Sequence, residues 1–94
     1  MRTFNRSTAV LKAAANVRRL EIICLLLRNK ELSVSDIADK VRLSLKSTSK
    51  HLQKLEQVGF IERKQRSRWG FYQICYSQMG FVKALLELIG KKVC

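Results

Sequence analysis

The side chains best suited to binding chemistry recur at helical spacing between residues 45 and 58 of this 94-residue sequence. One face of the segment combines cations with short hydrogen-bonding groups, namely Lys46, Ser47, Lys50, His51 and Lys54. Ammonium groups attract phosphates, and hydroxyl or imidazole groups form hydrogen bonds with phosphates and base edges. We therefore expect Ser47, Lys50 and His51 to reach bases or phosphates, with Lys46 and Lys54 at the phosphates beside them.

Each of these residues also has a simpler interpretation. A lone surface lysine is usually only solvated, and a helix-surface histidine often has no role. Their grouping on one face, directly after a break between two short helices, favours a binding surface. Ser49 follows the same helix and is expected to donate a hydrogen bond to a phosphate near the edge of the groove.

A second basic group lies in a polar turn at residues 64–68, between two segments rich in aromatic and branched residues. Arg63, Lys64, Arg66 and Arg68 supply its cations. Because the flanking segments have the composition of β-strands, the group is predicted to form a basic hairpin. Such a hairpin can lie along phosphates or enter a minor groove.

The overall charge agrees with these two groups. Lysine and arginine number 19 against 7 acidic residues, which gives a net charge of +12. An excess of this size indicates a polyanionic partner, with nucleic acid favoured over an anionic membrane surface or a mere solubility effect. The apolar run at residues 25–27 is too short to span a bilayer, and no signal peptide is visible. We expect a cytoplasmic protein, associated with the nucleoid of a prokaryotic, archaeal or viral host.

Catalytic and metal-binding arrangements are not found in the sequence. There is one histidine, and no cysteine–histidine pair, carboxylate pair or glycine-rich phosphate loop. We therefore expect no enzyme activity and no cofactor. Cys24, Cys75 and Cys94 match no disulfide or metal framework. Cys24 is interpreted as a small buried hydrophobic residue and Cys94 as part of a mobile end, so reduced thiols are expected.

The elements that must position these residues follow from periodicity and capping signals. Apolar residues at spacings of three and four predict helices, and Asn16, Ser33 and Ser44 are suitable N-caps. Gly59 is placed to end a helix. The predicted helices cover about residues 6–15, 16–29, 33–40, 45–58 and 77–91, and the two strands lie within residues 60–75.

This order of elements predicts a mainly α (α+β) winged helix-turn-helix fold. All 94 residues form one domain, with the helix-turn-helix at about 33–58, the wing at about 60–75 and a C-terminal dimerisation helix at about 77–91. The helix at 45–58 would enter the major groove of double-stranded DNA, and the hairpin would contact adjacent phosphates.

The stretch ELSVSDIADKVRLSLKSTSKHLQKLEQVGFIERKQRSRWGFYQI, residues 31–74, resembles the core of the ArsR/SmtB group of winged-helix repressors. The segment NVRRLEIICLLL resembles the second helix of that family. The resemblance implies recognition contacts at Ser47, Ser49 and His51. It also implies a homodimer built from the first and last helices, through apolar side chains that we assign to Val10, Leu11, Phe81, Val82, Leu85, Leu86, Leu88 and Ile89.

The sequence departs from the family at its metal sites. Ser33 and Ser35 stand where arsenic- and cadmium-type sensors have cysteines, and a hydroxyl does not replace a thiolate for soft metals. From Ser77 onward there is neither histidine nor aspartate. We therefore expect no metal. A further departure is Arg42, at a turn where glycine is common. If this position needs positive φ, an arginine there costs about 1 kcal/mol or more. Either the turn is built differently, or Arg42 repays the strain by touching phosphate.

Two alternatives stay open. A redox-responsive repressor would use Cys75 or Cys94 in a bond within or across the dimer. A winged-helix module that binds RNA or protein is the other, although the retained Lys46, Lys50 and Lys54 argue against a pure protein-binding role. For a chain this small, repression is the expected mode of regulation.

Overall fold

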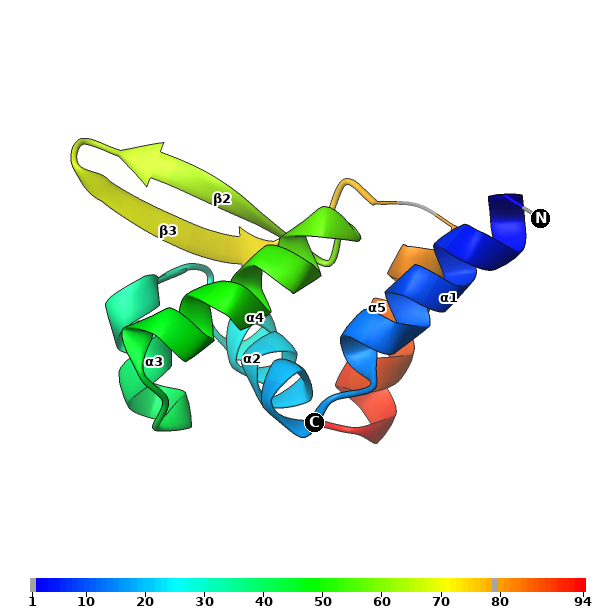
Figure 1. Ribbon diagram of the computed structural model, residues 1–94, viewed down its shortest axis with the longest axis horizontal. Coiled ribbons are helices and arrows are strands. Elements are labelled where there is room, and N and C mark those ends of the chain that lie inside the picture. Colours follow the sequence, from blue (N-terminus) through cyan, green and yellow to red (C-terminus); the bar gives the residue numbers. More distant parts are fainter. Residues whose placement is uncertain (1, 79) are drawn as a thin grey trace.

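The computed structural model describes residues 2–78 and 80–94, with side chains from Phe4 onward. The chain folds as a winged helix-turn-helix in which α3 and α4 pack side by side and a hairpin projects beside them (Figure 1). The elements are α1 (Arg2–Ala14), α2 (Val17–Arg28), β1 (Leu32–Ser33), α3 (Val34–Val41), α4 (Leu45–Gln57), β2 (Ile61–Arg66), β3 (Trp69–Ile74) and α5 (Phe81–Lys92).

Three helices begin at the residues that the sequence indicated. The side chains of Asn16, Ser33 and Ser44 each accept a hydrogen bond from the backbone N–H three residues ahead, at 3.1, 3.1 and 3.0 Å. Each cap satisfies one of the N–H groups that the first turn of a helix leaves without a partner. The start of the helix-turn-helix is thus fixed by local chemistry.

The turn between α3 and α4 places Arg42 in the left-handed region, at φ 57° and ψ 49°. The sequence had left open whether this turn needs positive φ, and the structure shows that it does, although the residue is an arginine. The conformation lets the N–H of Leu43 reach back to the carbonyl of Ala38 at 3.0 Å, which satisfies an end carbonyl of α3. Gly59 ends α4 in a similar way with φ 90°.

The sheet has three strands in the order β1-β3-β2, all antiparallel. The sequence analysis expected two strands and missed β1, because two residues are too few to show an alternating pattern. β1 pairs Leu32 with Tyr72 of β3 and so joins the base of the wing to the start of α3.

Three predicted boundaries need correction. Residues 64–66 belong to strand β2, so the hairpin turn contains only Ser67 and Arg68, with Ser67 at φ 56°. The last helix begins at Phe81 rather than Ser77, because Gly80 occupies the N-cap at φ 67°. The first helix begins at Arg2, four residues before the predicted start.

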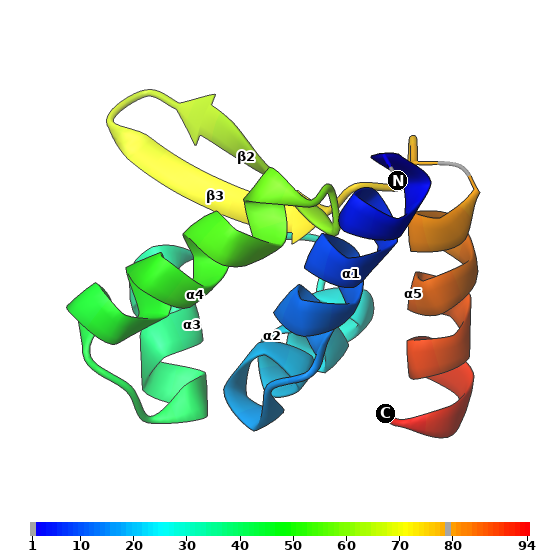
Figure 2. The same ribbon diagram turned by 45° about the vertical axis from the view of Figure 1, so that its right-hand side comes forward.

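The core lies between α2, α3, α4 and the base of the sheet, around Phe60, Ile22 and Leu52, each fully buried. α1 and α5 lie on the side of the molecule away from α3 and the wing tip (Figures 1 and 2). Half of the residues predicted at a dimer contact belong instead to this chain's own core, namely Val10, Val82, Leu86 and Ile89.

The cysteines correct a further expectation. Cys24 in α2 and Cys94 after α5 form a disulfide, with their Cα atoms 5.5 Å apart. The prediction of a free, mobile Cys94 and a reduced Cys24 was wrong, because α5 packs against α2 and brings the end of the chain to that helix. Cys24 is buried, as expected. Cys75 is free and half-buried, with its Sγ 3.3 Å from the hydroxyl of Ser77.

No helix of residues 2–78 and 80–94 is long and apolar enough to cross a membrane.

Candidate nucleic-acid interface

α4 is divided into a buried stripe and an outward face. Thr48, Leu52 and Leu55 are each fully buried against the core. With 3.6 residues per turn, the side chains roughly opposite this stripe are those of residues 46, 50, 53, 54 and 57, and all of them are exposed. The packed side of the helix thus sets the direction in which its polar side chains point.

The predicted contacts on α4 fall into two groups. Lys46, Ser47, Lys50 and Lys54 are exposed, on or beside the outward face. His51 is half-buried at the edge turned toward α2, where its Nδ1 atom lies 3.3 Å from the Nη1 atom of Arg19. The sequence predicted that His51 shares one face with the lysines. The structure instead places His51 at the edge of α4 and leaves the lysines on the outward face. Ser49 is half-buried on the other side of the helix.

The environment of His51 is strongly positive. Partial burial is the largest cause that lowers its pKa, followed by the charges of Arg19, Lys54 and Arg18. Each of these disfavours the imidazolium form. The neutral imidazole is therefore favoured over the imidazolium at His51.

Sequence reasoning missed Gln53, which is exposed on the outward face about one turn after Lys50. The same helical periodicity that identified the lysines gives its position, but a neutral amide carries no charge signal in the sequence. A glutamine amide can pair in a bidentate way with the N6 and N7 atoms of adenine. Gln53 thus joins the candidate base-reading residues.

Arg42 lies exposed at the turn before α4. Arg18 stabilises this turn, because its Nη1 donates a hydrogen bond to the carbonyl of Val41 at 2.9 Å. The same Nη1 atom lies 3.4 Å from the carboxylate of Glu21. The guanidinium of Arg42 is left on the surface beside the N-terminal end of α4.

The wing cations differ in their surroundings. Arg66 pairs with Glu31 at 2.6 Å, and its guanidinium lies 5.9 Å from the ring centroid of Phe71. Lys64 lies 3.7 Å from the carboxylate of Glu62 on its own strand. Arg66 is therefore engaged within the protein, although the sequence analysis treated it as a free cation of the turn.

Arg63 is on the opposite face of the hairpin. Its guanidinium covers Gly70, where an added Cβ would lie 2.6 Å from Nη2. It also lies beside Tyr72, whose pKa is raised by burial and by Glu56, while Arg63 opposes that rise. Arg68 is exposed at the tip, and among the described residues it has no ion pair. The adjoining Trp69 is 61% exposed, and the sequence analysis did not single it out.

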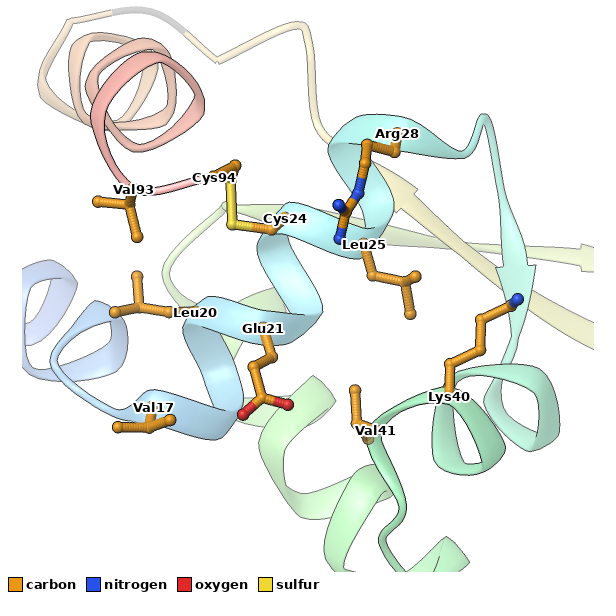
Figure 3. A pocket seen from close by; sticks show the side chains of 10 residues that line it. All are labelled: Val17, Leu20, Glu21, Cys24, Leu25, Arg28, Lys40, Val41, Val93 and Cys94. Atoms are coloured by element: carbon orange, nitrogen blue, oxygen red, sulfur yellow. A yellow bond between two sulfur atoms is a disulfide. The ribbon is translucent and has the colours of Figure 1, made fainter.

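A separate pocket of about 480 Å³ lies between α2, the end of α3 and the C-terminal residues (Figure 3). The Cys24–Cys94 disulfide forms one wall, and Leu20, Leu25 and Val41 supply apolar surface. Among the residues that the structure describes, no three histidine, cysteine, aspartate or glutamate side chains gather where they could hold a metal ion.

Comparison with known proteins agrees with this architecture. The family described as "Bacterial regulatory protein, arsR family" matches residues 16–63. The chain is 36% identical over 89 residues to the transcriptional activator HlyU of Vibrio cholerae, and the match covers 95% of this chain and 79% of that protein.

Solved structures give the same result. Reduced HlyU from Vibrio cholerae has a TM-score of 0.80 at 34% identity, covering 99% of this chain and 94% of that one. A solution structure from Mycobacterium bovis has a TM-score of 0.82 at 30% identity, covering 97% and 81%. It is described as a homodimeric winged helix-turn-helix DNA-binding domain of a possible ArsR-family transcriptional regulator.

Proposed function

This chain belongs to the ArsR family of bacterial regulatory proteins and is a DNA-binding transcriptional regulator, and from that premise we propose that it binds duplex DNA as a homodimer. In this proposal α4 enters the major groove and the wing follows the flanking backbone. The observation that carries it is the outward face of α4, where Lys46, Lys50 and Lys54 are exposed. The neutral amide of Gln53 is exposed on the same face. We also propose that the protein acts in the cytoplasm and has no enzyme activity.

The roles on α4 follow from position. Lys50 and Gln53 face outward at the middle of the helix, where base edges are within reach of a recognition helix. Lys46 and Lys54 flank them and contact phosphates, as does Arg42 at the preceding turn. Ser47 and Ser49 lie in the first turns and donate hydrogen bonds to the phosphates nearest the groove edge.

The wing adds backbone contacts from its tip and its edges. Arg68 is the cation best placed for this, because it is exposed at the turn and free of an ion pair among the described residues. Arg63 and Lys64 follow along β2. Arg66 contributes mainly by holding the wing against Glu31, so its phosphate contact is secondary.

The dimer contact is proposed for the exposed apolar side chains of α1 and α5. Leu11, Phe81 and Leu88 are 49%, 45% and 54% exposed, and Leu85 is half-buried beside them. Phe4 at 74% exposure extends the same apolar surface along α1. Burying these side chains against a second copy gains about 25 cal/mol per Å² of apolar surface, and it presents two α4 helices to successive major grooves.

Sedimentation tests the dimer directly. The unmodified chain is expected to sediment at about twice the chain mass, and Leu88→Glu combined with Phe81→Glu is expected to give monomers. Lys83→Glu changes the charge of α5 at an exposed position and serves as the matched control. A monomeric unmodified chain would contradict the proposal.

DNA binding is tested by titrating mixed-sequence duplex DNA, single-stranded DNA and RNA at several salt concentrations. We expect tightest binding to the duplex and a steep loss of affinity with salt, because phosphate contacts release counterions. Equal affinity for the three nucleic acids would contradict the proposal and favour an RNA-binding or general polyanion role. A reporter gene with and without the regulator decides between repression, which we propose, and activation, the activity named for the Vibrio cholerae relative.

A second function, redox-responsive regulation, is favoured by the Cys24–Cys94 disulfide. The bond ties the end of α5 to α2, and α2 packs against both α3 and α4. Two molecules of a small thiol would reduce it, each losing one electron and one proton to the cysteines, and would leave as a disulfide. The sequence analysis considered Cys75 or Cys94, and the pairing now supports Cys94 with Cys24.

The redox candidate is tested by measuring duplex affinity for the oxidised and the reduced protein, with the thiol state verified by alkylation and mass measurement. Cys24→Ser and Cys94→Ser are each expected to match the reduced protein in both states. Cys75→Ser is the control that keeps the response. Identical affinity of the two redox states would exclude the candidate.

A further inference from the structure

Arg19 connects three helices through one side chain. Its Nε donates to the carbonyl of Ala13 at 2.5 Å and its Nη2 to the carbonyl of Lys12 at 3.2 Å, both in the last turn of α1. Its Nη1 lies 3.3 Å from Nδ1 of His51 on α4. Since Arg19 itself belongs to the first turn of α2, the guanidinium joins the end of α1 to the recognition helix.

The chemistry of the contact decides the state of His51. A guanidinium has only donors, so Nδ1 of His51 must accept, and a ring that accepts at Nδ1 carries its proton on Nε2. Nδ1 is thereby occupied. Among the hydrogen bonds of the described residues His51 makes no other, so Nε2–H stays available on a half-exposed ring.

We propose that Arg19 is a positioning residue for DNA binding, which holds His51 as the neutral Nε2–H tautomer so that its ring donates a hydrogen bond to a phosphate oxygen. This proposal rests on the proposed binding of duplex DNA. A phosphate is the favoured acceptor because His51 lies at the edge of α4 among cations, with Arg18 and Arg19 on α2 and Lys54 on α4 around it. These cations attract a negatively charged acceptor to the position of His51. The neutral ring can donate to that acceptor without first taking up a proton.

The same arrangement stabilises the charged guanidinium of Arg19 next to His51. The two carbonyls of α1 stand at the negative end of that helix and hold the guanidinium in place. The Nδ1 atom of a neutral His51 then accepts the remaining hydrogen bond of the Arg19 guanidinium. The lowered pKa of His51 is the result expected of this arrangement, since protonation would break the contact and bring two cations together.

The tautomer is tested in the DNA-free protein. His51 is the sole histidine, so the imidazole ¹⁵N spectrum reports this ring alone. We expect the unmodified protein at pH 7.5 to show one neutral tautomer with the proton on Nε2. Arg19→Gln, whose shorter side chain does not reach His51, is expected to give a mixture of tautomers and a higher pKa of the ring.

Arg18→Gln is the matched control, because it removes an equal charge from the neighbouring position without a hydrogen bond to His51. It is expected to keep the Nε2–H tautomer. A mixed or protonated ring in the unmodified protein would overturn the proposal, whether or not Arg19→Gln folds. Loss of the tautomer in Arg18→Gln would also overturn it, since the effect would then belong to charge rather than to the Arg19 contact.

The DNA contact is tested with His51→Phe, which keeps a ring of similar shape but has no donor. Duplex affinity is expected to fall about three- to tenfold, the effect of one hydrogen bond, with the slope of log affinity against log salt unchanged. Lys46→Gln, by contrast, removes a proposed phosphate contact from each protomer and should reduce that slope by about two. A reduced slope in His51→Phe, or an unchanged affinity, would overturn the proposed donor role. Absence of duplex binding by the unmodified protein would refute the proposed function, whereas the tautomer experiment stands independently of it.

Discussion

The two basic regions of the molecule, α4 and the wing, carry the same residue types in different states. On α4 the lysines of the outward face are exposed and form no ion pair with the described residues. On the wing, Arg66 is paired with Glu31, Lys64 lies near Glu62, and Arg63 covers Gly70. A helix backed by a core directs its polar face to solvent, whereas a short sheet brings side chains of neighbouring strands together.

This difference shows that a cation counted in a sequence is not always available to a ligand. The helix offers charge for binding, and the wing uses part of its charge to fix its own position. Under the proposed function, a wing held by internal ion pairs would lose less conformational entropy on binding DNA, so these pairs would assist recognition. Substitutions in α4 and in the wing test whether the two regions differ in this way.

The largest effect is expected for Lys46→Gln with Lys54→Gln on α4. Both side chains are exposed and are proposed to contact phosphates, so a dimer loses four such contacts. The salt slope of duplex affinity should therefore fall by about four, and the affinity by about tenfold or more. Circular dichroism should show an unchanged fold, because neither residue is buried. A slope equal to that of the unmodified protein would place the electrostatic contact elsewhere.

On the wing, Arg68→Gln and Arg66→Gln are expected to separate binding from stability. Arg68→Gln removes one proposed phosphate contact from each protomer, so it should reduce the salt slope by about two and leave the melting temperature unchanged. Arg66→Gln should change the slope little and lower the free energy of unfolding by about 1 kcal/mol or less, since Arg66 itself is largely solvent-exposed. Thermal melts and salt titrations of both variants give the comparison, and equal slopes for the two would contradict it.

A smaller effect is expected on the buried side of α4. The hydroxyl of Thr48 is fully buried and has no hydrogen-bond partner among the described residues. Thr48→Val keeps the shape and removes the unsatisfied group, so it should stabilise the fold by about 1 kcal/mol and raise the melting temperature by about 4–8 °C. Thr48→Ser, which keeps the hydroxyl and removes a methyl group, is the control and should destabilise.

The smallest expected effect is the pH dependence contributed by His51. Its pKa in the folded protein is lower than the ordinary value of 6.5, so the unfolded chain binds the proton more readily. The contribution to stability is therefore complete above about pH 6.5 and decreases as the pH falls through the folded-state value. Denaturant melts between pH 5 and pH 7.5 should show this decrease, and His51→Gln should reduce it. Greater stability of the unmodified protein at pH 5.5 than at pH 7.5 would contradict the sign.

The sequence by itself determined the features that depend on neighbours a few residues apart. The caps at Asn16, Ser33 and Ser44 and the helix end at Gly59 each involve contacts within one or two turns of backbone. The left-handed conformation of Arg42 was left open, because an arginine does not by itself indicate positive φ. Helical periodicity gave the buried stripe of α4, and with it the outward face that carries the proposed binding residues. Local signals also indicated the wing, apart from the extent of its turn.

Only the tertiary structure decided which distant side chains meet. The Cys24–Cys94 bond, the Arg66–Glu31 pair and the Arg19–His51 contact join residues 70, 35 and 32 positions apart. Such contacts depend on how α5 packs on α2, how β1 joins the sheet and how α1 ends beside α4, and no local spacing encodes these. Residue types therefore gave the chemistry available to this protein, and packing selected which groups remain free to bind and which hold the fold.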